Sequence, residues 1–384
     1  MFEPLTFADL SALAPDTRIY CQPACFVERP HGLDGRVARI GDGMVWFAAW
    51  AVTVRGPSMP KREALVPVEA MTDWVAALPE PVAARASAQI AAVAAPRPAL
   101  ALANGRTIRL AEPQVMGILN VTPDSFSDGG KHVDAQAATD AGFDMTSAGA
   151  AIVDVGGEST RPGAPLVWEG DEIERVVPVI ERLARGGVAV SVDTRKAAVM
   201  QAALAAGAGI VNDVAALAYD DRATEVVAKA GCPVILMHAP SQKSDPHDLS
   251  ALPGGKYADA ALDVFDWLEA RIAAVTAAGV ARDRIIADPG IGFGKGVEDN
   301  LRIINALPLF HALGVPLLFA ASRKRFIGAI DGEAEAKDRL GGSLATAMNA
   351  VSQGAHMVRV HDVRETRQAL RVWRAMRDTA LTRM

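Results

Sequence analysis

Cysteine is scarce in this sequence, and the scarcity limits what sulfur can do. The three cysteines, Cys21, Cys25 and Cys232, are too few for a disulfide framework. Cys21 and Cys25 form a C-x3-C pair, but no second pair of ligands lies nearby, so free thiols fit this pair better than zinc does. Because no signal-peptide pattern is present either, the sequence predicts a cytoplasmic protein.

The sequence also lacks an excess of basic residues and a long apolar run. Its 39 Lys and Arg residues face 45 Asp and Glu residues, which gives a net charge of −6, whereas a nucleic-acid-binding surface needs a basic face. No apolar stretch reaches the ~18 residues of a membrane span. These deficits argue against nucleic-acid and membrane partners and leave small molecules as the expected ligands.

The chain is longer than one barrel requires, since its 384 residues exceed the ~250 typical of a (β/α)8 barrel. Residues 1–95 contain short β-like runs between Gly and Pro turns, then two helix-like stretches, and this pattern predicts a small α+β module of unknown function. Residues 96–113 read as a linker and a hairpin around Asn104 and Gly105, because Asn-Gly accepts the positive φ of a tight turn. We expect this hairpin to cap a barrel formed by residues 114–384.

Apolar runs of strand length alternate with helix-like stretches from Gln114 onward, and every run ends in polar residues. Eight strand–helix units in series predict an α/β fold, the (β/α)8 TIM barrel, in which the carboxyl ends of the strands open onto one catalytic face. The residues that end the eight runs are Asn120, Gly156-Gly157-Glu158, Asp193, Asn212-Asp213, His238, Asp288, Ser322-Arg323-Lys324 and Arg359-Val360-His361. The sequence therefore indicates an architecture and a candidate site together.

The polar run ends indicate the chemistry of a ligand. Asp193, Asn212 and Asp288 would form a polar floor, which suits a flat heterocycle with several N–H and C=O groups, since a buried site must satisfy each of them. Four basic side chains gather positive charge at the same mouth: Arg161, Lys324, Arg359 and His361. Arg grips phosphate through paired hydrogen bonds and Lys acts as a point charge, so we expect a ligand with a phosphate-like anionic end.

Several candidates also have a simpler structural explanation. Asp193 lies at a strand–helix junction, where Asp commonly caps a helix, and His238 taken alone fits a buried structural histidine. The string GIGFGKG after Asp288 lacks the Ser or Thr and the spacing of a P-loop, so we interpret it as a tight loop whose backbone approaches a ligand. The remaining assignments are His132, His247, His311 and His356 to the surface or to packing, and Asp362 to a cap of the last helix.

Six separated segments, taken in their order and spacing, resemble the dihydropteroate synthases of folate biosynthesis over about residues 100–380. The segments are residues 116–130, 156–164, 191–195, 288–295, 322–324 and 359–361. The resemblance implies a transferase that joins 6-hydroxymethyl-7,8-dihydropterin pyrophosphate to p-aminobenzoate with the help of Mg2+, releasing pyrophosphate and 7,8-dihydropteroate. It also implies a dissociative substitution, a sulfonamide target and, as we expect, a homodimer.

The resemblance assigns roles to individual residues. Those that match the pterin pocket are Asp193, Asn212, Met237, Asp288, Lys324 and Arg359. Those that match the pyrophosphate end are Asn120, which would also hold the metal, Arg161, Arg359 and His361. Those that match the p-aminobenzoate slot are Phe126, Thr160, Arg161, Pro162, Phe293 and Ser322. Asp128 matches a loop aspartate that steadies positive charge on the methylene carbon, and the expected catalytic set is Asp128, Lys324, Arg161 and His361.

Two departures and two rival functions qualify the resemblance. The loop after His238 lacks the family's Met-x-Gly-x-Pro pattern, and Arg325 follows Lys324 where many members have Ser. A pterin-binding methyltransferase would use the same barrel, but it has no pyrophosphate to grip, so the basic motifs argue against it. A non-catalytic pterin-binding protein is expected to have lost Asn120 or the loop residues, and these are present.

Overall fold

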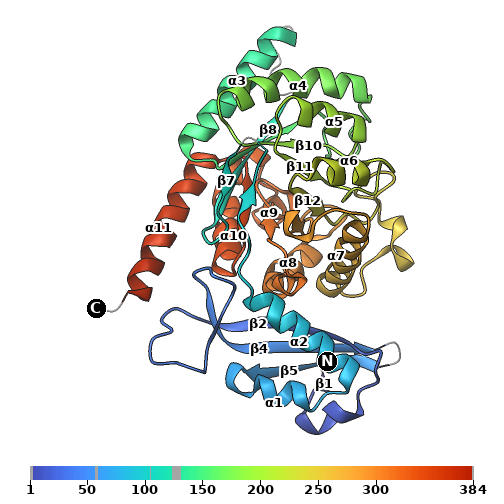
Figure 1. Cartoon of the computed structure of the whole chain (residues 1–384), viewed down its shortest axis with the longest axis vertical. Helices are drawn as coiled ribbons and strands as arrows, with labels where there is room; N and C mark the ends of the chain where they lie inside the picture. Colours follow the sequence, from blue (N-terminus) through green and yellow to red (C-terminus); the bar gives the residue numbers. More distant parts are fainter. Residues whose placement is uncertain (1–2, 57–58, 104, 123–130, 383–384) are drawn as a thin grey trace.

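The computed structural model describes residues 3–56, 59–103, 105–122 and 131–382. It confirms the predicted architecture, because eight parallel strands form one sheet that curves into a barrel with helices outside it (Figure 1). The smaller N-terminal module lies beside the barrel, next to α7 and α8 (Figure 1). Among the described residues, no helix combines the length and apolar character needed to cross a membrane.

The barrel strands follow one another around the sheet in chain order. They are β8 (Gln114–Asn120), β9 (Ile152–Gly156), β10 (Val190–Asp193), β11 (Ile210–Asp213), β12 (Val234–Met237), β13 (Ile285–Asp288), β14 (Leu318–Phe319) and β15 (Met357–Val360). A parallel bridge between Ala287 and Leu317 joins β13 to the entry of β14. The register places Asp193 beside Gly156 and Asn212, and Met237 beside Asp288, so the polar strand ends share one rim.

Helices surround the strands because the strands are apolar on both faces and need cover outside the barrel. The outer helices are α3 (Lys131–Ala148), α4 (Glu169–Arg185), α5 (Ala197–Ala205), α6 (Ala223–Ala230), α7 (Ala260–Ala277), α8 (Val297–Asn305), α9 (Arg325–Ile330), α10 (Leu340–Ser352) and α11 (Val363–Leu381). The sequence predicts one helix through residue 314 after β13, but α8 ends and a 3-10 helix, η7 (Leu307–Leu313), follows. Pro308 explains the break, because it has no N–H to continue the α-helical ladder.

A short hairpin closes the amino-terminal end of the barrel. Strands β6 (Leu100–Ala101) and β7 (Thr107–Ile108) pair antiparallel, while Asn104 lies outside the described residues. Leu100 and Ile108 are buried in one cluster with residues that point into the barrel, among them Met116. The hairpin therefore adds apolar side chains to the interior of the barrel at the end opposite the polar rim.

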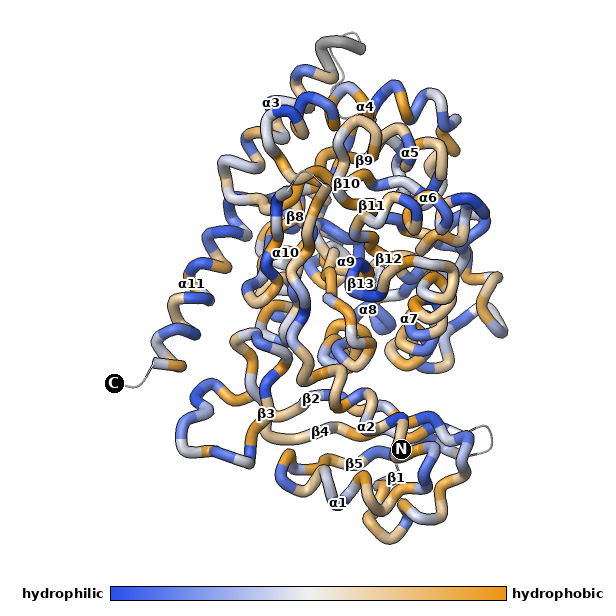
Figure 2. The backbone as a smooth tube through the Cα atoms, viewed as in Figure 1, coloured by the Kyte–Doolittle hydropathy of each residue, from blue (hydrophilic) through white to orange (hydrophobic). Residues whose placement is uncertain are grey.

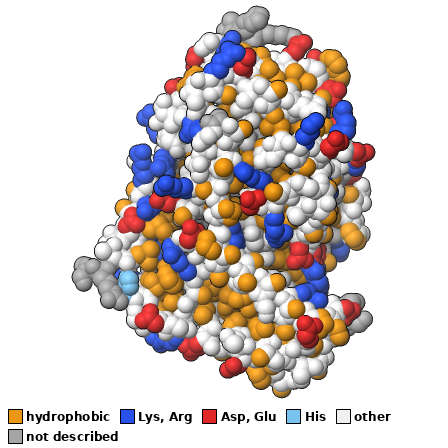
Figure 3. Space-filling view, in the orientation of Figure 1, with side chains coloured by type: hydrophobic (Ala, Val, Ile, Leu, Met, Phe, Trp, Pro, Cys, Tyr) orange, Lys and Arg blue, Asp and Glu red, His pale blue; other side chains and the backbone are white. Residues whose placement is uncertain are grey.

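The N-terminal module is a sheet with helices. Its elements are β1 (Glu3–Pro4), η1 (Phe7–Ala12), β2 (Arg18–Val27), β3 (Ala38–Arg39), β4 (Trp46–Gly56), β5 (Met59–Pro67), η2 (Val68–Ala70), α1 (Met71–Ala76) and α2 (Glu80–Ala94), with sheet order β1-β5-β4-β2. Apolar residues concentrate along its central strands and along those of the barrel, whereas α11 is largely hydrophilic (Figure 2). On the face shown in Figure 3, hydrophobic side chains gather over this module, and charged side chains of both signs are interspersed elsewhere.

Apolar and charged contacts join the module to the barrel. Elements β2 and α2 contact η7, and one continuous cluster of buried side chains runs from the module into the barrel helices. Tyr20 meets Phe265 of α7 edge-on, with 5.8 Å between ring centroids. Arg18 and Arg55 both form ion pairs with Asp266. The module therefore covers the outer side of α7 and η7.

Candidate active site

Two carboxylates and one guanidinium form the floor of the site at the carboxyl ends of β9, β10 and β15. Arg359 donates from Nε to Oδ2 of Asp154 and from Nη2 to Oδ2 of Asp193, both at 2.6 Å. Asn212 donates from Nδ2 to the same Asp154 oxygen at 2.9 Å. Burial raises the pKa of the Asp193 carboxyl, and the guanidinium of Arg359 opposes this rise. The helix after β10 has Lys196 at its N-cap, so the capping explanation for Asp193 is wrong.

Asp154 belongs to this floor although the sequence analysis did not single it out. Its side chain is fully buried, and its second oxygen, Oδ1, has no hydrogen-bond partner among the described residues. A buried carboxylate oxygen without a donor carries an energetic cost that a ligand N–H would remove. The available signal was an acidic residue inside an otherwise apolar strand, in the string AIVDV.

Asp288 and Lys324 form a second wall of the site, around the glycine-rich loop after β13. Asp288 accepts the backbone N–H of Gly290 at 2.7 Å, and burial raises the pKa of its carboxyl. Lys324 donates to the carbonyl of Ile291, and burial lowers the pKa of its ammonium group to about 8. A Cβ on Gly292 would lie 2.6 Å from Cδ of Lys324, and φ there is +84°, so a side chain would displace the lysine.

Lys295 holds the loop after β13 in place through hydrogen bonds to its backbone. This residue lies in the glycine-rich motif, but no role was predicted for it. Its buried ammonium group donates to the carbonyls of Gly290 and Phe293 at 2.8 and 3.1 Å. It also lies 3.2 Å from Nδ1 of His238, whose buried ring meets Trp267 edge-on. His238 is thus the structural histidine of the simpler explanation, and burial lowers its pKa well below the usual range.

Met237 and Phe293 give the site an apolar wall. Met237 is buried with Val214 and Ala239, and the half-buried Phe293 packs against this cluster. The ammonium nitrogen of Lys324 lies 4.2 Å from the centroid of the Phe293 ring, a cation–π distance. The wall therefore places an aromatic face beside a charged group.

His361 and Ser322 lie together at the ends of β15 and β14. Oγ of Ser322 is 3.0 Å from Nδ1 of His361, and the backbone N–H of His361 donates to the same oxygen at 3.2 Å. Burial, with Arg323 and Arg359 nearby, lowers the pKa of His361 to about 4. His361 was expected to add positive charge at the mouth, but with this pKa the ring is neutral at pH 7. Arg359 likewise faces two carboxylates, so positive charge at the mouth rests more on Lys324 and Arg161.

Asp362 is not the helix cap that the sequence analysis expected. It occupies the N-cap position of α11 but makes no side-chain capping hydrogen bond. Its carboxylate instead accepts from Nε of Arg323 at 3.0 Å and from Nη2 of the same guanidinium. Arg323 adopts a positive φ of 57°, a conformation unusual for a residue with a side chain. The ion pair therefore helps to hold the turn that presents Ser322 and Lys324.

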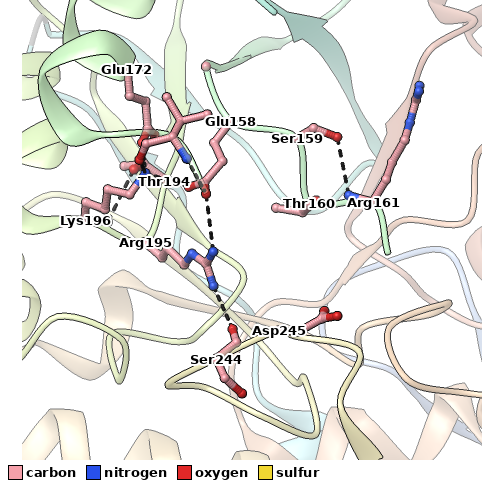
Figure 4. A network of polar contacts seen from close by, with 12 residues as sticks. Glu158, Ser159, Thr160, Arg161, Glu172, Thr194, Arg195, Lys196, Ser244 and Asp245 are labelled. Carbon is pink, nitrogen blue, oxygen red and sulfur yellow. Dashed lines mark hydrogen bonds and ion pairs between the residues drawn. The ribbon is translucent and has the colours of Figure 1, made fainter. Parts of the chain in front are cut away.

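The loop after β9 carries three predicted residues, Thr160, Arg161 and Pro162. Arg161 and Pro162 are exposed and Thr160 is half-buried, so all three can be reached by a ligand. The Arg161 backbone N–H makes a weak 3.4 Å contact with Oγ of Ser159 (Figure 4). Asn120, at the end of β8, is half-buried and pairs in register with Gly156, where this loop begins.

A buried ion network holds the base of the loop after β9, and the sequence analysis did not predict it. Lys196 donates to Glu158 at 2.7 Å and to Glu172 at 2.6 Å, and Arg195 reaches Glu158 at 3.3 Å (Figure 4). Arg195 and Lys196 follow Asp193 directly after the strand end. One short segment therefore supplies the floor and also anchors the neighbouring loop.

Two predicted residues, Phe126 and Asp128, lie outside the described residues.

Asn212 and Asp213 end the same strand, but their side chains have different partners. Asp213 accepts the backbone N–H groups of Ala215 and Leu217 at 2.7 and 2.8 Å. Burial raises the pKa of Asp213 to about 6. Asp213 therefore shapes the loop after β11, while Asn212 contributes to the floor.

The described residues form no preformed cage for a metal ion, and the resemblance implies only the amide oxygen of Asn120 as a protein ligand. Within the described ranges, no group of three or more His, Cys, Asp or Glu side chains is placed to hold a metal ion. Mg2+ commonly binds through few protein ligands, keeps several waters and takes its other oxygens from substrate phosphates. The amide oxygen of Asn120 at the rim suits a Mg2+ ion of that kind.

The region of the chain that forms the barrel and its site is similar to known proteins. Residues 116–361 match the family described as pterin binding enzymes. The dihydropteroate synthase of Escherichia coli (strain K12) is 45% identical over 271 residues, covering 70% of this chain and 94% of the relative. The Xanthomonas albilineans dihydropteroate synthase structure with 4-aminobenzoic acid is 45% identical, with a TM-score of 0.67, and the match covers 73% of this chain and 98% of that one. The same enzyme in complex with 7,8-dihydropteroate is 43% identical, with a TM-score of 0.65 and coverage of 72% and 98%.

Proposed function

This chain belongs to the dihydropteroate synthase family of pterin-binding enzymes, and we propose that it condenses 6-hydroxymethyl-7,8-dihydropterin pyrophosphate with p-aminobenzoate. The products are 7,8-dihydropteroate and pyrophosphate. The observation that carries this proposal is the polar floor, where Arg359 joins Asp154 to Asp193 and Asn212 donates to Asp154. A flat ring with several hydrogen-bonding groups fits this floor better than an apolar or a purely anionic ligand does.

The pterin ring lies between the floor and the loop after β13. Asp193 and Asp154 accept its N–H groups, and Asn212 offers both a donor and an acceptor. Asp288 and Lys324 supply an acceptor and a donor from the second wall, where Met237 covers an apolar part of the ring. Arg359 stays in the floor, because its two ion pairs fix the plane of the guanidinium.

The reaction exchanges one bond at the methylene carbon for another. The bond from this carbon to the pyrophosphate oxygen breaks, the p-aminobenzoate nitrogen forms a new bond to the carbon, and that nitrogen then gives one proton to solvent water. Lys324 and Arg161 stabilise the negative charge that develops on the leaving group. His361, neutral in the free site, serves the leaving group as a hydrogen-bonding ring. Asp128 is proposed to steady positive charge on the methylene carbon.

The metal proposal rests on the chemistry of the rim. Asn120 would hold a Mg2+ ion through its amide oxygen, next to the place of the pyrophosphate. When bound, it would neutralise charge on the leaving group. The absence of a carboxylate cage among the described residues fits an ion that enters together with the substrate.

p-Aminobenzoate fits beside the pterin, in a slot lined by Phe293, Thr160, Pro162 and Ser322, with Phe126 proposed as a further wall. Arg325 is exposed at the start of α9, where backbone N–H groups and its own charge favour a carboxylate. We propose that sulfonamides compete for the same slot. The cytoplasmic location, supported by three free cysteines, and the homodimer stay predictions.

Neither rival function explains the site as well. A pterin-binding methyltransferase needs no leaving-group site, yet Lys324, Arg161 and Asn120 lie at the rim with access to one. A non-catalytic pterin-binding protein would need only the floor. The two alternatives are separated from the proposed function by product formation, since neither makes a bond to p-aminobenzoate.

Labelled p-aminobenzoate provides the test. The purified chain, supplied with Mg2+ and the pterin pyrophosphate, is expected to convert the label to 7,8-dihydropteroate, identified by mass and by chromatography against a standard. Heat-denatured protein and a reaction without the pterin substrate serve as controls. Pterin binding without label transfer would favour the non-catalytic alternative and overturn the proposal.

A further inference from the structure

The loop after β12 is the part of the site that the proposed function leaves without a role. It spans residues 238–259 and contains two short 3-10 turns, η4 (Leu249–Ala251) and η5 (Pro253–Gly255). This is also where the sequence departs from the Met-x-Gly-x-Pro pattern. Its histidine, His247, was expected at the surface or in packing, and the ring does pack, between two other loops of the site.

His247 contacts the loops after β9 and β13 at the same time. Its Nε2 lies 2.9 Å from the carbonyl oxygen of Thr160, and its Nδ1 accepts the backbone N–H of Gly294 at 3.3 Å. The imidazole stacks on Phe293, with 5.0 Å between the ring centroids and 18° between the planes. Thr160 and Phe293 are residues from two sides of the proposed p-aminobenzoate slot. One ring therefore fixes the two sides relative to each other.

The contacts require one protonation state of the imidazole. The Gly294 N–H can only donate, so Nδ1 accepts with its lone pair, and Nε2 carries the hydrogen that it donates to Thr160. Burial and the nearby ammonium groups of Lys324 and Lys295 lower the pKa of His247, opposed by the Thr160 carbonyl and Asp245. The neutral ring is thus the form that suits the geometry.

The loop that carries His247 is itself anchored. Arg195 donates from Nη1 to the carbonyl of Ser244 at 2.9 Å, next to the ion network of Glu158 (Figure 4). Oγ of Ser241 lies 2.7 Å from Oγ of Ser244, and the backbone N–H of His247 donates to Asp245 at 2.9 Å. These contacts restrict the position of the imidazole before any ligand enters.

We propose that His247 is a positioning residue that sets the width of the p-aminobenzoate slot by tying Thr160 to the loop of Phe293. The inference rests on the proposed function, because it concerns the second substrate of that reaction. His247 acts through its neighbours and not on the reacting atoms, so its loss affects the binding of p-aminobenzoate more than the chemical step. Within the described part of the chain, the hydrogen bonds and ring contact of His247 go to Thr160, Asp245, Gly294 and Phe293 and not to the floor residues, so the floor keeps its affinity for the pterin.

Two substitutions separate the contacts of the ring. His247→Phe keeps an aromatic ring against Phe293 and removes both hydrogen bonds. His247→Gln restores a donor that can reach the Thr160 carbonyl. The matched control is His31→Phe, since His31 is exposed in the N-terminal module and its Nε2 lies 2.8 Å from the carbonyl oxygen of Leu381 in α11. Steady-state kinetics with saturating pterin pyrophosphate, pterin affinity by calorimetry and thermal melting are measured for each protein.

His247→Phe is expected to raise the KM for p-aminobenzoate about tenfold, the change that ~1.4 kcal/mol produces. The kcat at saturation and the Kd for pterin stay within about twofold of the unsubstituted chain, and His247→Gln recovers part of the loss. His31→Phe leaves all three quantities unchanged. Should His247→Phe fail to fold, His247→Asn takes its place, because its shorter amide cannot bridge both loops.

An unchanged KM for p-aminobenzoate in folded His247→Phe overturns the inference. So does an equal loss of affinity for both substrates, because a general structural defect would produce it. The proposed function is tested separately by the unsubstituted chain. If that chain makes no dihydropteroate, the function is wrong, whereas an active chain with insensitive His247 variants contradicts only the positioning role.

Discussion

Asp193→Asn tests whether the strand-end floor binds the pterin ring. The substitution is nearly isosteric, but it removes a negative charge and replaces one acceptor by an N–H donor. Asp193 is one of two carboxylates on Arg359, at 2.6 Å, and the other, Asp154, remains. We therefore expect the guanidinium to keep its place and the chain to stay folded, with the loss concentrated in ligand binding.

The size of the effect follows from the hydrogen bonds at stake. A hydrogen bond to a charged group contributes about 1.5–3 kcal/mol, which corresponds to an affinity about 10- to 150-fold weaker. A donor facing the ring's N–H groups adds repulsion, so we expect the upper part of this range. Calorimetric titration with 6-hydroxymethyl-7,8-dihydropterin, a probe without pyrophosphate, measures the floor alone.

Asp213→Asn is the matched control, because Asp213 is also a buried aspartate at a strand end. Its carboxylate accepts the backbone N–H groups of Ala215 and Leu217, not those of a ligand. We expect this variant to lose about 1–3 kcal/mol of its free energy of unfolding and therefore to melt at a lower temperature. Its affinity for the pterin should stay normal. If folded Asp193→Asn binds the pterin within about twofold of the unsubstituted chain, the floor is not the pterin site.

Three further predictions concern charge, loop assembly and the N-terminal module. Because Lys324 is cationic below its pKa of about 8, kcat/KM for the pterin pyrophosphate should fall above pH 8. Lys324→Arg stays charged and should abolish that decline. If kcat/KM falls equally above pH 8 in both proteins, the decline does not come from Lys324. Pyrophosphate with Mg2+ should lower the Kd of p-aminobenzoate, and p-aminobenzoate should lower the Kd of pyrophosphate by the same factor. If calorimetry shows no change in either Kd, the loops that bind pyrophosphate do not assemble the p-aminobenzoate slot. A chain that starts at Ala99 should keep pterin binding and measurable turnover. It should melt at a lower temperature, because it loses the contacts of Tyr20 and Arg18 with α7. If the shortened protein folds but is inactive at saturating substrates, the N-terminal module contributes to the active site.

The sequence predicted the barrel because each buried strand is a mostly apolar run that is followed by a polar residue at its carboxyl end. Asn212 and Asp193 lie side by side in the register, as their equivalent places in consecutive runs require. Asp154 escaped notice because its partner Arg359 is distant in the sequence and neither run shows the pairing by itself. An acidic residue within a buried strand is a usable signal for such a partner, since an unpaired charge there is costly.

Loop contacts and charge states were harder to predict than strand ends. His247 lies in a loop without periodicity, and its role depends on Thr160 and Phe293, which come from two other loops. The positive charge assigned to His361 changes once burial and the neighbouring Arg323 are known. The capping role assigned to Asp362 failed for the same reason, because Arg323 takes its carboxylate from across the site. The role of His247, the charge of His361 and the partner of Asp362 all depend on residues that are close in space but distant in the sequence. A local sequence pattern cannot predict such contacts.

The condensation itself is tested most directly by counting pyrophosphate against dihydropteroate in one reaction of the intact chain. With Mg2+ and both substrates, one pyrophosphate should appear for each dihydropteroate formed, and omission of either substrate should stop product formation. Sustained pyrophosphate release without p-aminobenzoate would show hydrolysis of the pterin substrate instead of condensation. No pyrophosphate release from the folded protein with both substrates would contradict the proposed function.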